Sequence, residues 1–363
     1  MSGTAVVVGA GIGGLATALG LRRAGWSVSV LDRRPDVERY GTAFGIHPTA
    51  QAALERLGAG GEFWSRAVPY RGARIRTPDG TVLASLPLER IEKRAGRPEL
   101  LISRPYLVDG LLERLAAFGD VPLKFGERVE GADDVAKLLS DHHLVIGADG
   151  INSAVRTARF GTRSAPRRIG TVAWIGTADF ETGVYGETWG SGRFFGMTPV
   201  EPGRTNWYAT VPEATTATEL RAAFADWHAP IPRILTDTDP DTWIRYEMRH
   251  LYPALPTFVA PSAPSAPSVP SAPSAPVALV GDAAHAMTPN LGQGACTALL
   301  DAEALTRALA DHGPEGLPAA LRAYDKERRR SAQRVALGSR TLHRFMSVRR
   351  TGLRNALLRT LPG

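Results

Sequence analysis

Three glycine-rich turns, each with an aspartate, carry the residue types that hold phosphate and ribose groups. The first is G-x-G-x-x-G at Gly9, Gly11 and Gly14, directly after the apolar run AVVV. In such a turn the first glycine permits a tight bend, the second lets backbone approach a pyrophosphate, and the third lets the helix pack on its strand. Asp32 follows about twenty residues later, where a ribose hydroxyl would lie. This turn predicts a dinucleotide site.

The second and third turns extend the site beyond one nucleotide. GADGINSAVR contains Asp149 and Gly150, and GDAAHAMTPNLGQGA contains Gly281 and Asp282. An NAD-dependent dehydrogenase has no need for two further acids at strand ends. FAD, in contrast, must be held at its adenosine, pyrophosphate, ribityl chain and isoalloxazine. The three turns together therefore favour FAD over NAD.

The motifs and their order resemble those of the group A flavoprotein monooxygenases, the FAD-dependent aromatic hydroxylases with a para-hydroxybenzoate hydroxylase-like fold. The resemblance rests on the first glycine turn, on Asp149–Gly150 with Ser153 and Arg156 downstream, and on Gly281–Asp282. It spans nearly the whole chain and is specific for the superfamily. It does not select a substrate.

The resemblance implies a role for each motif residue. Asp32, with Arg33 nearby, would hold the adenosine ribose, and Arg104 would contact the ribityl or pyrophosphate region. Asp149 lies in a motif associated with both FAD and NAD(P)H binding, and Asp282 would accept a hydrogen bond from the ribityl chain. The implied cofactor-binding glycines are Gly9, Gly11, Gly14, Gly150, Gly281, Gly292 and Gly294.

Residues on the flavin and substrate side are implied in the same way. The loop from Pro289 to Gly294 would pass beside the isoalloxazine, where backbone N–H groups and a helix N-terminus stabilise negative charge. His47 is the candidate substrate contact, with a plain surface histidine as the equal alternative. His285 is interpreted as a hydrogen-bonded structural histidine rather than a catalytic base. Some aromatic residues of the following sheet should line an apolar pocket and most should be core: Trp174, Trp189, Phe194, Phe195, Trp207 and Tyr208.

The activity that the resemblance implies is monooxygenation. NADPH or NADH would reduce FAD, O₂ would form a flavin C4a-hydroperoxide, and one oxygen atom would pass to a small aromatic, polyene or biosynthetic substrate. No second G-x-G-x-x-G follows a strand, so the nicotinamide would bind without a Rossmann domain of its own. The alternatives are an FAD-dependent reductase or dehydrogenase of the geranylgeranyl-reductase kind and a non-catalytic flavin-binding protein. A flavin halogenase is disfavoured, because its W-x-W-x-I-P motif is absent: Trp174 is followed by Ile175 and Gly176.

The elements that must position these residues follow from the hydrophobic pattern. Residues 4–32 are typical of strand, glycine turn, helix and strand, and 168–250 contains alternating, aromatic-rich segments typical of antiparallel strands. The expected fold is α/β: a Rossmann-like FAD-binding domain, a second domain built on an antiparallel β-sheet, and C-terminal helices. The expected boundaries are 1–68, 98–165 and 277–335 for the FAD-binding domain, 69–97 and 166–259 for the sheet domain, 260–276 for a Pro/Ser/Ala-rich loop, and 336–363 for the C-terminal segment.

Composition limits the class of protein. The chain has 363 residues, 44% hydrophobic and 22% charged, as in soluble globular proteins. Its one cysteine, Cys296, and the lack of a Cys/His cluster fit a reducing cytoplasmic setting without a metal. No apolar run reaches the length of a membrane span. The net charge is +7, and the Arg-rich C-terminal part is interpreted as a solvated helix rather than a nucleic-acid or membrane surface. The expected partners are a small aromatic or apolar molecule and O₂.

Overall fold

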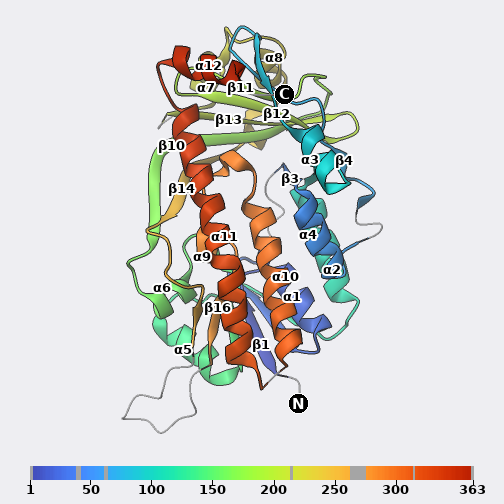
Figure 1. Ribbon diagram of the computed structural model, residues 1–363, viewed down its shortest axis with the longest axis vertical. Helices are drawn as coiled ribbons and strands as arrows, with labels where there is room; N and C mark the ends of the chain where they lie inside the picture. Colours follow the sequence, from blue (N-terminus) through green and yellow to red (C-terminus); the bar gives the residue numbers. More distant parts are fainter. Residues whose placement is uncertain are drawn as a thin grey trace.

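The computed structural model describes residues 3–37, 42–60, 64–212, 216–261, 275–313 and 315–360. Most strands of this part of the chain lie in two large sheets at opposite ends of the molecule, and the long helices α10 and α11 run between them (Figure 1). The expected α/β fold with a Rossmann-like unit and a second sheet is confirmed. Residues 262–274 of the predicted Pro/Ser/Ala-rich loop lie outside the described residues.

A six-stranded, mainly parallel sheet carries the three glycine turns. Its order is β15-β16-β9-β1-β2-β8, and only β15 is antiparallel to its neighbour. The central strands are buried along almost their whole length, which is why they are nearly continuous runs of apolar residues. The strands are β1 (Thr4–Val8), β2 (Ser27–Asp32), β8 (Leu123–Phe125), β9 (Leu144–Gly147), β15 (Val259–Ala260) and β16 (Val277–Leu279).

Helices cover this sheet and begin at the turns. α1 packs against α10 and α4, and α10 packs against α2 and α11. Ser103 caps α4 by accepting a hydrogen bond from the Tyr106 N–H at 3.4 Å. The helices of this part are α1 (Ile12–Arg23), α2 (Pro48–Arg56), α4 (Arg104–Ala116), α5 (Ala132–Asp141), α6 (Ala154–Phe160), α9 (Asp282–His285), the 3₁₀ turn η3 (Pro289–Leu291) and α10 (Gly294–His312).

A seven-stranded sheet forms the second unit, in the order β14-β10-β13-β12-β11-β5-β6. All neighbours are antiparallel except β11 and β5, which pair in parallel with Gly186 opposite Arg74. The β5–β6 hairpin turns at Gly80, whose φ of +88° favours glycine. The strands are β5 (Arg74–Arg76), β6 (Val82–Ser85), β10 (Ala165–Ala178), β11 (Gly186–Trp189), β12 (Phe194–Glu201), β13 (Arg204–Pro212) and β14 (Ile244–Tyr252).

The two faces of this sheet divide the aromatic residues. Trp174, Phe195 and Trp207 pack with α7 (Ala217–Phe224) and α8 (Ile231–Asp237) in one buried cluster. Trp189 and Phe194 belong to a different cluster, which includes the C-terminal end of α11. The expectation that most of these aromatics are core is therefore confirmed, and Tyr208, which is only partly buried, lies on the same face as Trp189 and Phe194.

Smaller elements connect the two units. A three-stranded sheet in the order β3-β7-β4 lies against β12. The long helix α11 runs without a break past position 336, where the sequence suggested a separate C-terminal segment, and reaches the seven-stranded sheet (Figure 1). Among the described residues, no helix has the length and apolar character needed to cross a membrane. These elements are β3 (Ala43–Ile46), β4 (Val68–Pro69), β7 (Leu100–Ser103), α3 (Leu88–Ala95), α11 (Leu317–Met346) and α12 (Thr351–Arg359).

Candidate cofactor and substrate site

The first turn has the close backbone packing that its glycines predict. Gly9 has a φ of +110°, and a Cβ there would overlap the carbonyl oxygen of Ala148, which directly follows the neighbouring strand β9. A Cβ at Gly14 would overlap the carbonyl oxygen of Gly9 itself. At Gly11, in contrast, a Cβ would meet nothing within 4 Å. Two glycines thus serve packing, and the third leaves open space above the N-terminus of α1, where a phosphate would be favoured.

Asp32 ends β2 beside this turn. It is buried, and its Oδ2 accepts a hydrogen bond from the Ala10 N–H at 2.8 Å while Oδ1 accepts one from the Arg34 N–H at 2.9 Å. Arg34 also brings its guanidinium to 3.9 Å from Oδ1. Arg33, which the resemblance placed near the ribose, is exposed. The arginine that contacts Asp32 is therefore Arg34.

The second turn is held by Asp149 at the start of α6. Its Oδ2 accepts hydrogen bonds from the N–H groups of Ala154 (2.7 Å) and Val155 (3.2 Å). Its Oδ1 is buried and has no hydrogen-bond partner among the described residues. Burial raises the pKa of Asp149, and hydrogen bonds from Ser153 and the helix N–H groups offset part of this rise. Gly150 follows with a φ of +78°. One carboxylate oxygen thus remains for a ligand.

Arg156 joins the second turn to the third. This buried side chain donates from Nη1 to the Ala283 carbonyl oxygen at 3.0 Å and from Nη2 to the Ile151 carbonyl oxygen at 2.7 Å. Burial lowers its pKa, and the negative charges of Asp149 and Asp282 oppose that shift. Within this sequence motif, Arg156 therefore links the second turn to the third and has a structural role rather than a cofactor-binding one.

Asp282, the first residue of α9, is accessible yet surrounded by protein. Desolvation raises its pKa, while the positive charges of His285, Arg104 and Arg156 lower it by less. It also acts on Tyr246 of β14, because partial desolvation by the surrounding protein and the Asp282 charge raise the pKa of that phenol to about 12. The raised pKa of this accessible carboxyl indicates that the surrounding protein limits its hydration. The structure thus brings Asp282, Arg104 and Arg156 together, and adds Tyr246.

A buried charged cluster lies beneath this turn and was not anticipated from the sequence. Asp301 of α10, fully buried, accepts hydrogen bonds from the Gly281 N–H at 3.1 Å and from Arg328 Nε at 2.9 Å, and pairs with His285 Nε2. Gly281 has a φ of +59°. The buried, paired His285 has the structural role expected of it. The signal available for Asp301 was an acid within an alanine- and leucine-rich helix, a weak signal because the same helix also contains Glu303 and Arg307.

The flavin-side loop continues from this turn. Pro289 begins η3, Gly292 has a φ of +63°, and Gly294 starts α10. A Cβ at either glycine would meet nothing within 4 Å. The loop is tied to α11 because Ser339 Oγ lies 3.0 Å from Thr288 Oγ1 and accepts from the Leu291 N–H at 3.3 Å. Its glycines therefore face open space while its ends are fixed.

His47 lies next to this loop but is occupied locally. Its Nδ1 caps α2, lying 3.4 Å from the Thr49 N–H and 3.0 Å from Thr49 Oγ1. The His47 N–H points to Cys296 Sγ at 3.5 Å, near the start of α10. Burial lowers the pKa of His47 and raises that of Cys296 to about 12. The geometry places His47 beside the predicted flavin loop, and a substrate contact through it stays a prediction.

A polar cluster on the seven-stranded sheet was missed by sequence reasoning. Glu187 of β11 accepts hydrogen bonds from Trp189 Nε1 at 2.7 Å and from the Tyr208 hydroxyl at 3.1 Å. Burial raises the pKa of Glu187, and these two bonds offset part of that rise. A Cβ at Gly196 would overlap the Tyr208 ring, so this glycine lets the ring lie across β12. The only signal was an acid within the short strand GETW.

This cluster shares a face of the sheet with Tyr246. Tyr208 pairs with Ile175 and Tyr246 with Ala173, and residues two apart on one strand point to the same side. Because Tyr246 is close enough to Asp282 for its pKa to respond, this face of the sheet looks toward the third glycine turn. The polar cluster therefore lies on the same side of the sheet as the third turn, with three strands between β14, which carries Tyr246, and β11, which carries Glu187.

The residues fit an extended dinucleotide. The first turn provides open space at Gly11, the second an Asp149 oxygen without a hydrogen-bond partner among the described residues, and the third an accessible Asp282 carboxyl. All three lie at the carboxyl ends of neighbouring parallel strands. Within the part of the chain that the structure describes, no group of three or more His, Cys, Asp or Glu side chains could hold a metal ion. The site is thus suited to a nucleotide cofactor.

Comparison with known sequences agrees with this geometry. The sequence family described as "FAD binding domain" matches residues 3–252 and 271–339. Aurachin C monooxygenase/isomerase of Stigmatella aurantiaca is 33% identical over 356 residues, which are 93% of this chain and 88% of the relative. The 2-heptyl-3-hydroxy-4(1H)-quinolone synthase of Pseudomonas aeruginosa is 30% identical over 323 residues, 84% of this chain and 80% of the relative.

Solved structures share the fold. The HpxO protein of Klebsiella pneumoniae, in complex with FAD and uric acid, superposes with a TM-score of 0.81 over 99% of this chain and 93% of that chain, at 24% identity. At this identity the likeness establishes the architecture of both units and their arrangement.

Proposed function

The chain belongs to the FAD-binding family of group A flavoprotein monooxygenases, and from this premise we propose that it oxygenates a neutral heteroaromatic ring. The cofactor is FAD, with NADPH or NADH as the electron donor. When bound, FAD supplies the electron transfer from the nicotinamide and the activation of O₂. The protein's own residues must bind the cofactor, orient the ring and keep water away.

We assign the binding of the cofactor to the three turns. The open space at Gly11 and the N-terminus of α1 would accept the pyrophosphate, and Asp32 would hold the adenosine ribose through its remaining lone pairs. Asp282 would accept hydrogen bonds from the ribityl hydroxyls, with Arg104 close enough to offset its charge. Gly292 and Gly294 would let backbone N–H groups approach the isoalloxazine.

Replacing Asp282 by alanine tests this assignment. A hydrogen bond to a charged group contributes about 1.5–3 kcal/mol, so the dissociation constant of FAD should rise about 10–100-fold. Because the side chain is accessible, the unfolding temperature of the cofactor-free protein should be unchanged. The measurement is quenching of FAD fluorescence on titration with apoprotein. Asp282→Asn, which keeps one acceptor oxygen, should bind FAD with intermediate affinity, and unchanged FAD affinity in both variants would contradict the proposed grip.

The substrate assignment rests on one observation, the Glu187–Tyr208 pair on the sheet face that looks toward Asp282. Glu187 has two lone pairs beyond those used by Trp189 and Tyr208, so it can accept an N–H or O–H of a bound ring. Both groups that donate hydrogen bonds to Glu187, the Trp189 indole N–H and the Tyr208 hydroxyl, are uncharged. A carboxylate substrate would therefore meet another carboxyl without a compensating cation. A neutral ring that donates a hydrogen bond is favoured.

Quinolone-type rings meet these requirements. They are electron-rich, uncharged and carry a ring N–H. The name of the Pseudomonas aeruginosa relative contains a 3-hydroxy-4(1H)-quinolone, the product expected when one oxygen atom enters such a ring. This agreement supports the class of substrate that the polar pair favours.

The test uses 2-heptyl-4(1H)-quinolone and salicylate as neutral and anionic probes, with NADPH and ¹⁸O₂. The quinolone should yield a hydroxylated product with one ¹⁸O atom, and salicylate should not react. Glu187→Gln should lower kcat/KM for the quinolone by about 10–100-fold, because a buried hydrogen bond to a charged group is lost. Glu201→Gln, at the end of β12 and outside the cluster, is the matched control. Oxygenation of salicylate in preference to the quinolone would refute the proposal.

A further inference from the structure

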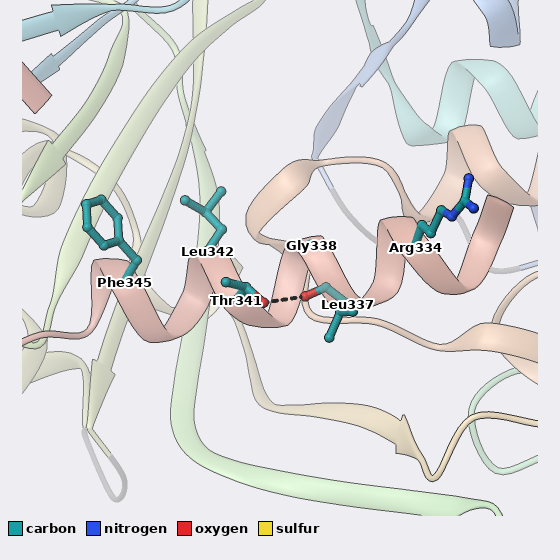
Figure 2. A pocket seen from close by; sticks show the side chains of 6 residues that line it. All are labelled: Arg334, Leu337, Gly338, Thr341, Leu342 and Phe345. Carbon is teal, nitrogen blue, oxygen red and sulfur yellow. Dashed lines mark hydrogen bonds between the residues drawn. The ribbon is translucent and has the colours of Figure 1, made fainter. Parts of the chain in front are cut away.

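A second apolar surface begins where the proposed ring site ends. A groove of about 600 Å³ runs along one face of α11 and is lined by Arg334, Leu337, Gly338, Thr341, Leu342 and Phe345. These residues recur at helical spacing and extend over about 16 Å of helix axis. Figure 2 shows the lining residues following one another along the helix, with Arg334 at one end and Phe345 at the other.

One end of the groove packs against side chains that contact the Glu187–Tyr208 pair. Leu342 and Phe345 pack in the same apolar cluster as Phe194 and Tyr208. The Phe345 ring lies edge-on to Trp189, with centroids 6.2 Å apart, and Trp189 is the residue that donates to Glu187. Only the Trp189 side chain therefore separates this end of the groove from the Glu187 carboxyl, which we assign to the substrate ring.

The middle of the groove meets the flavin-side loop. Gly338 lies in the interior of the 30-residue helix α11, where glycine costs about 1 kcal/mol relative to alanine. A Cβ there would contact only Leu291 of η3, at 3.4 Å, so the space above it is otherwise open. A glycine that weakens a helix and leaves open space beside the site is consistent with room kept for a ligand.

Apart from the Arg334 guanidinium at one end, the groove offers few hydrogen-bonding groups to a polar ligand. The Thr341 hydroxyl donates to the Leu337 carbonyl oxygen at 2.9 Å, so its hydrogen is used within the helix (Figure 2). Leu337 is 54% exposed and Leu291 is 41% exposed, although both border the site. Large apolar side chains left open next to a binding region are typical of a ligand groove.

We propose that this groove binds a flexible apolar chain attached to the substrate ring, so that α11 selects alkyl-substituted over unsubstituted rings. The inference rests on the proposed function, because it places the ring at Glu187 and Tyr208. The chain would leave the ring past Trp189 and Phe345 and lie over Gly338 and Leu337. Chain length would then control affinity, whereas the polar pair controls the chemistry of the ring.

The expected effect is large because burying one methylene fully changes affinity about fourfold. In an open groove only about half of this free energy is gained, which corresponds to an increase in affinity of about twofold per methylene. The probes are 2-methyl- and 2-heptyl-4(1H)-quinolone, which differ by six methylenes, so the heptyl compound should bind the FAD-loaded enzyme on the order of 50-fold more tightly. Binding is measured by equilibrium dialysis, independently of turnover.

Two variants locate the effect. Gly338→Leu fills the groove and Leu337→Asp places a charge in it, and each should reduce the preference for the heptyl probe to within about fivefold while leaving 2-methylquinolone binding unchanged. Leu353→Asp is the matched control, since Leu353 is an exposed leucine of α12 outside the groove. Equal affinity for both probes in the wild type, or a preference that survives both groove variants, would overturn the inference.

The remaining outcomes separate the groove from the proposed function. Oxygenation of 2-methylquinolone without any gain from the heptyl chain would refute the groove and retain the function. A chain-length preference without oxygenation would refute the function and retain the groove, and a failure of both probes to bind would refute both. If Leu337→Asp instead converts an oligomer into a monomer without changing probe binding, measured by light scattering, the groove is a protein interface and the inference is wrong.

Discussion

Replacing Gly14 by alanine is expected to unfold the nucleotide-binding turn and abolish stable FAD binding. The new Cβ would overlap the carbonyl oxygen of Gly9, and it would also approach Ala148 Cβ at 3.2 Å. Because both obstacles belong to the backbone and the neighbouring strand, α1 must move away from β1. Such overpacking costs about 3 kcal/mol or more. The variant should therefore show a lower unfolding temperature without cofactor and a more than 100-fold weaker FAD complex, on the order of 2.7 kcal/mol.

Gly11→Ala is the matched control for this prediction. A Cβ at Gly11 would meet nothing within 4 Å, and the Gly11 backbone, with φ −75° and ψ 176°, is allowed for alanine. The apoprotein should keep its unfolding temperature and lose only FAD affinity. Thermal unfolding of both apoproteins and FAD titration separate the two effects. Equal stability of the Gly14→Ala and Gly11→Ala apoproteins would show that the close packing at Gly14 is not required.

Replacing Asp301 by alanine is expected to lower the free energy of unfolding by about 3–5 kcal/mol. The substitution leaves the buried Arg328 without its ionic partner and removes the acceptor for His285 and for the Gly281 N–H. Since Gly281 positions Asp282, FAD affinity should fall as well. Urea unfolding measures the first effect and FAD titration the second.

Two further variants define the cause. Asp179→Ala removes an exposed acid that pairs with Arg204, and an exposed pair contributes at most about 1 kcal/mol. Asp301→Asn keeps the size of the side chain and removes only the charge, so it should be destabilised less than Asp301→Ala. A loss for Asp301→Ala no larger than that for Asp179→Ala would contradict the importance assigned to the buried cluster.

The same cluster predicts a pH dependence. Burial alone would raise the pKa of Asp301, but the charges and hydrogen bonds of His285 and Arg328 outweigh burial and lower the pKa. A carboxyl with a lowered pKa in the folded state adds stability above its unfolded pKa of about 3.9, and this contribution is lost as the pH falls through the folded value. Below about pH 4, the wild type should therefore lose stability more steeply than Asp301→Asn.

The cofactor turns could be predicted because their signals are local. Gly9, Gly150 and Gly281 need positive φ angles, and such positions select glycine regardless of the rest of the fold. The strand before each turn is a buried apolar run, and Ser103 marks the start of α4 by a contact within one helical turn. Local backbone requirements of this kind are written in consecutive residues.

The sequence by itself determined the order of the three turns, the α/β architecture, the antiparallel sheet and hence the family and its FAD cofactor. The tertiary structure decided which arginine contacts Asp32, which face each aromatic residue occupies, and that Asp301 lies beneath the third turn. It also brought together the Glu187–Tyr208 pair and the groove on α11, to which we assign the substrate. These features depend on contacts between distant residues, such as Arg156 and the Ala283 carbonyl oxygen 127 positions apart. A side chain's chemistry is visible in the sequence, but its partner and direction are fixed only when packing brings separate elements together.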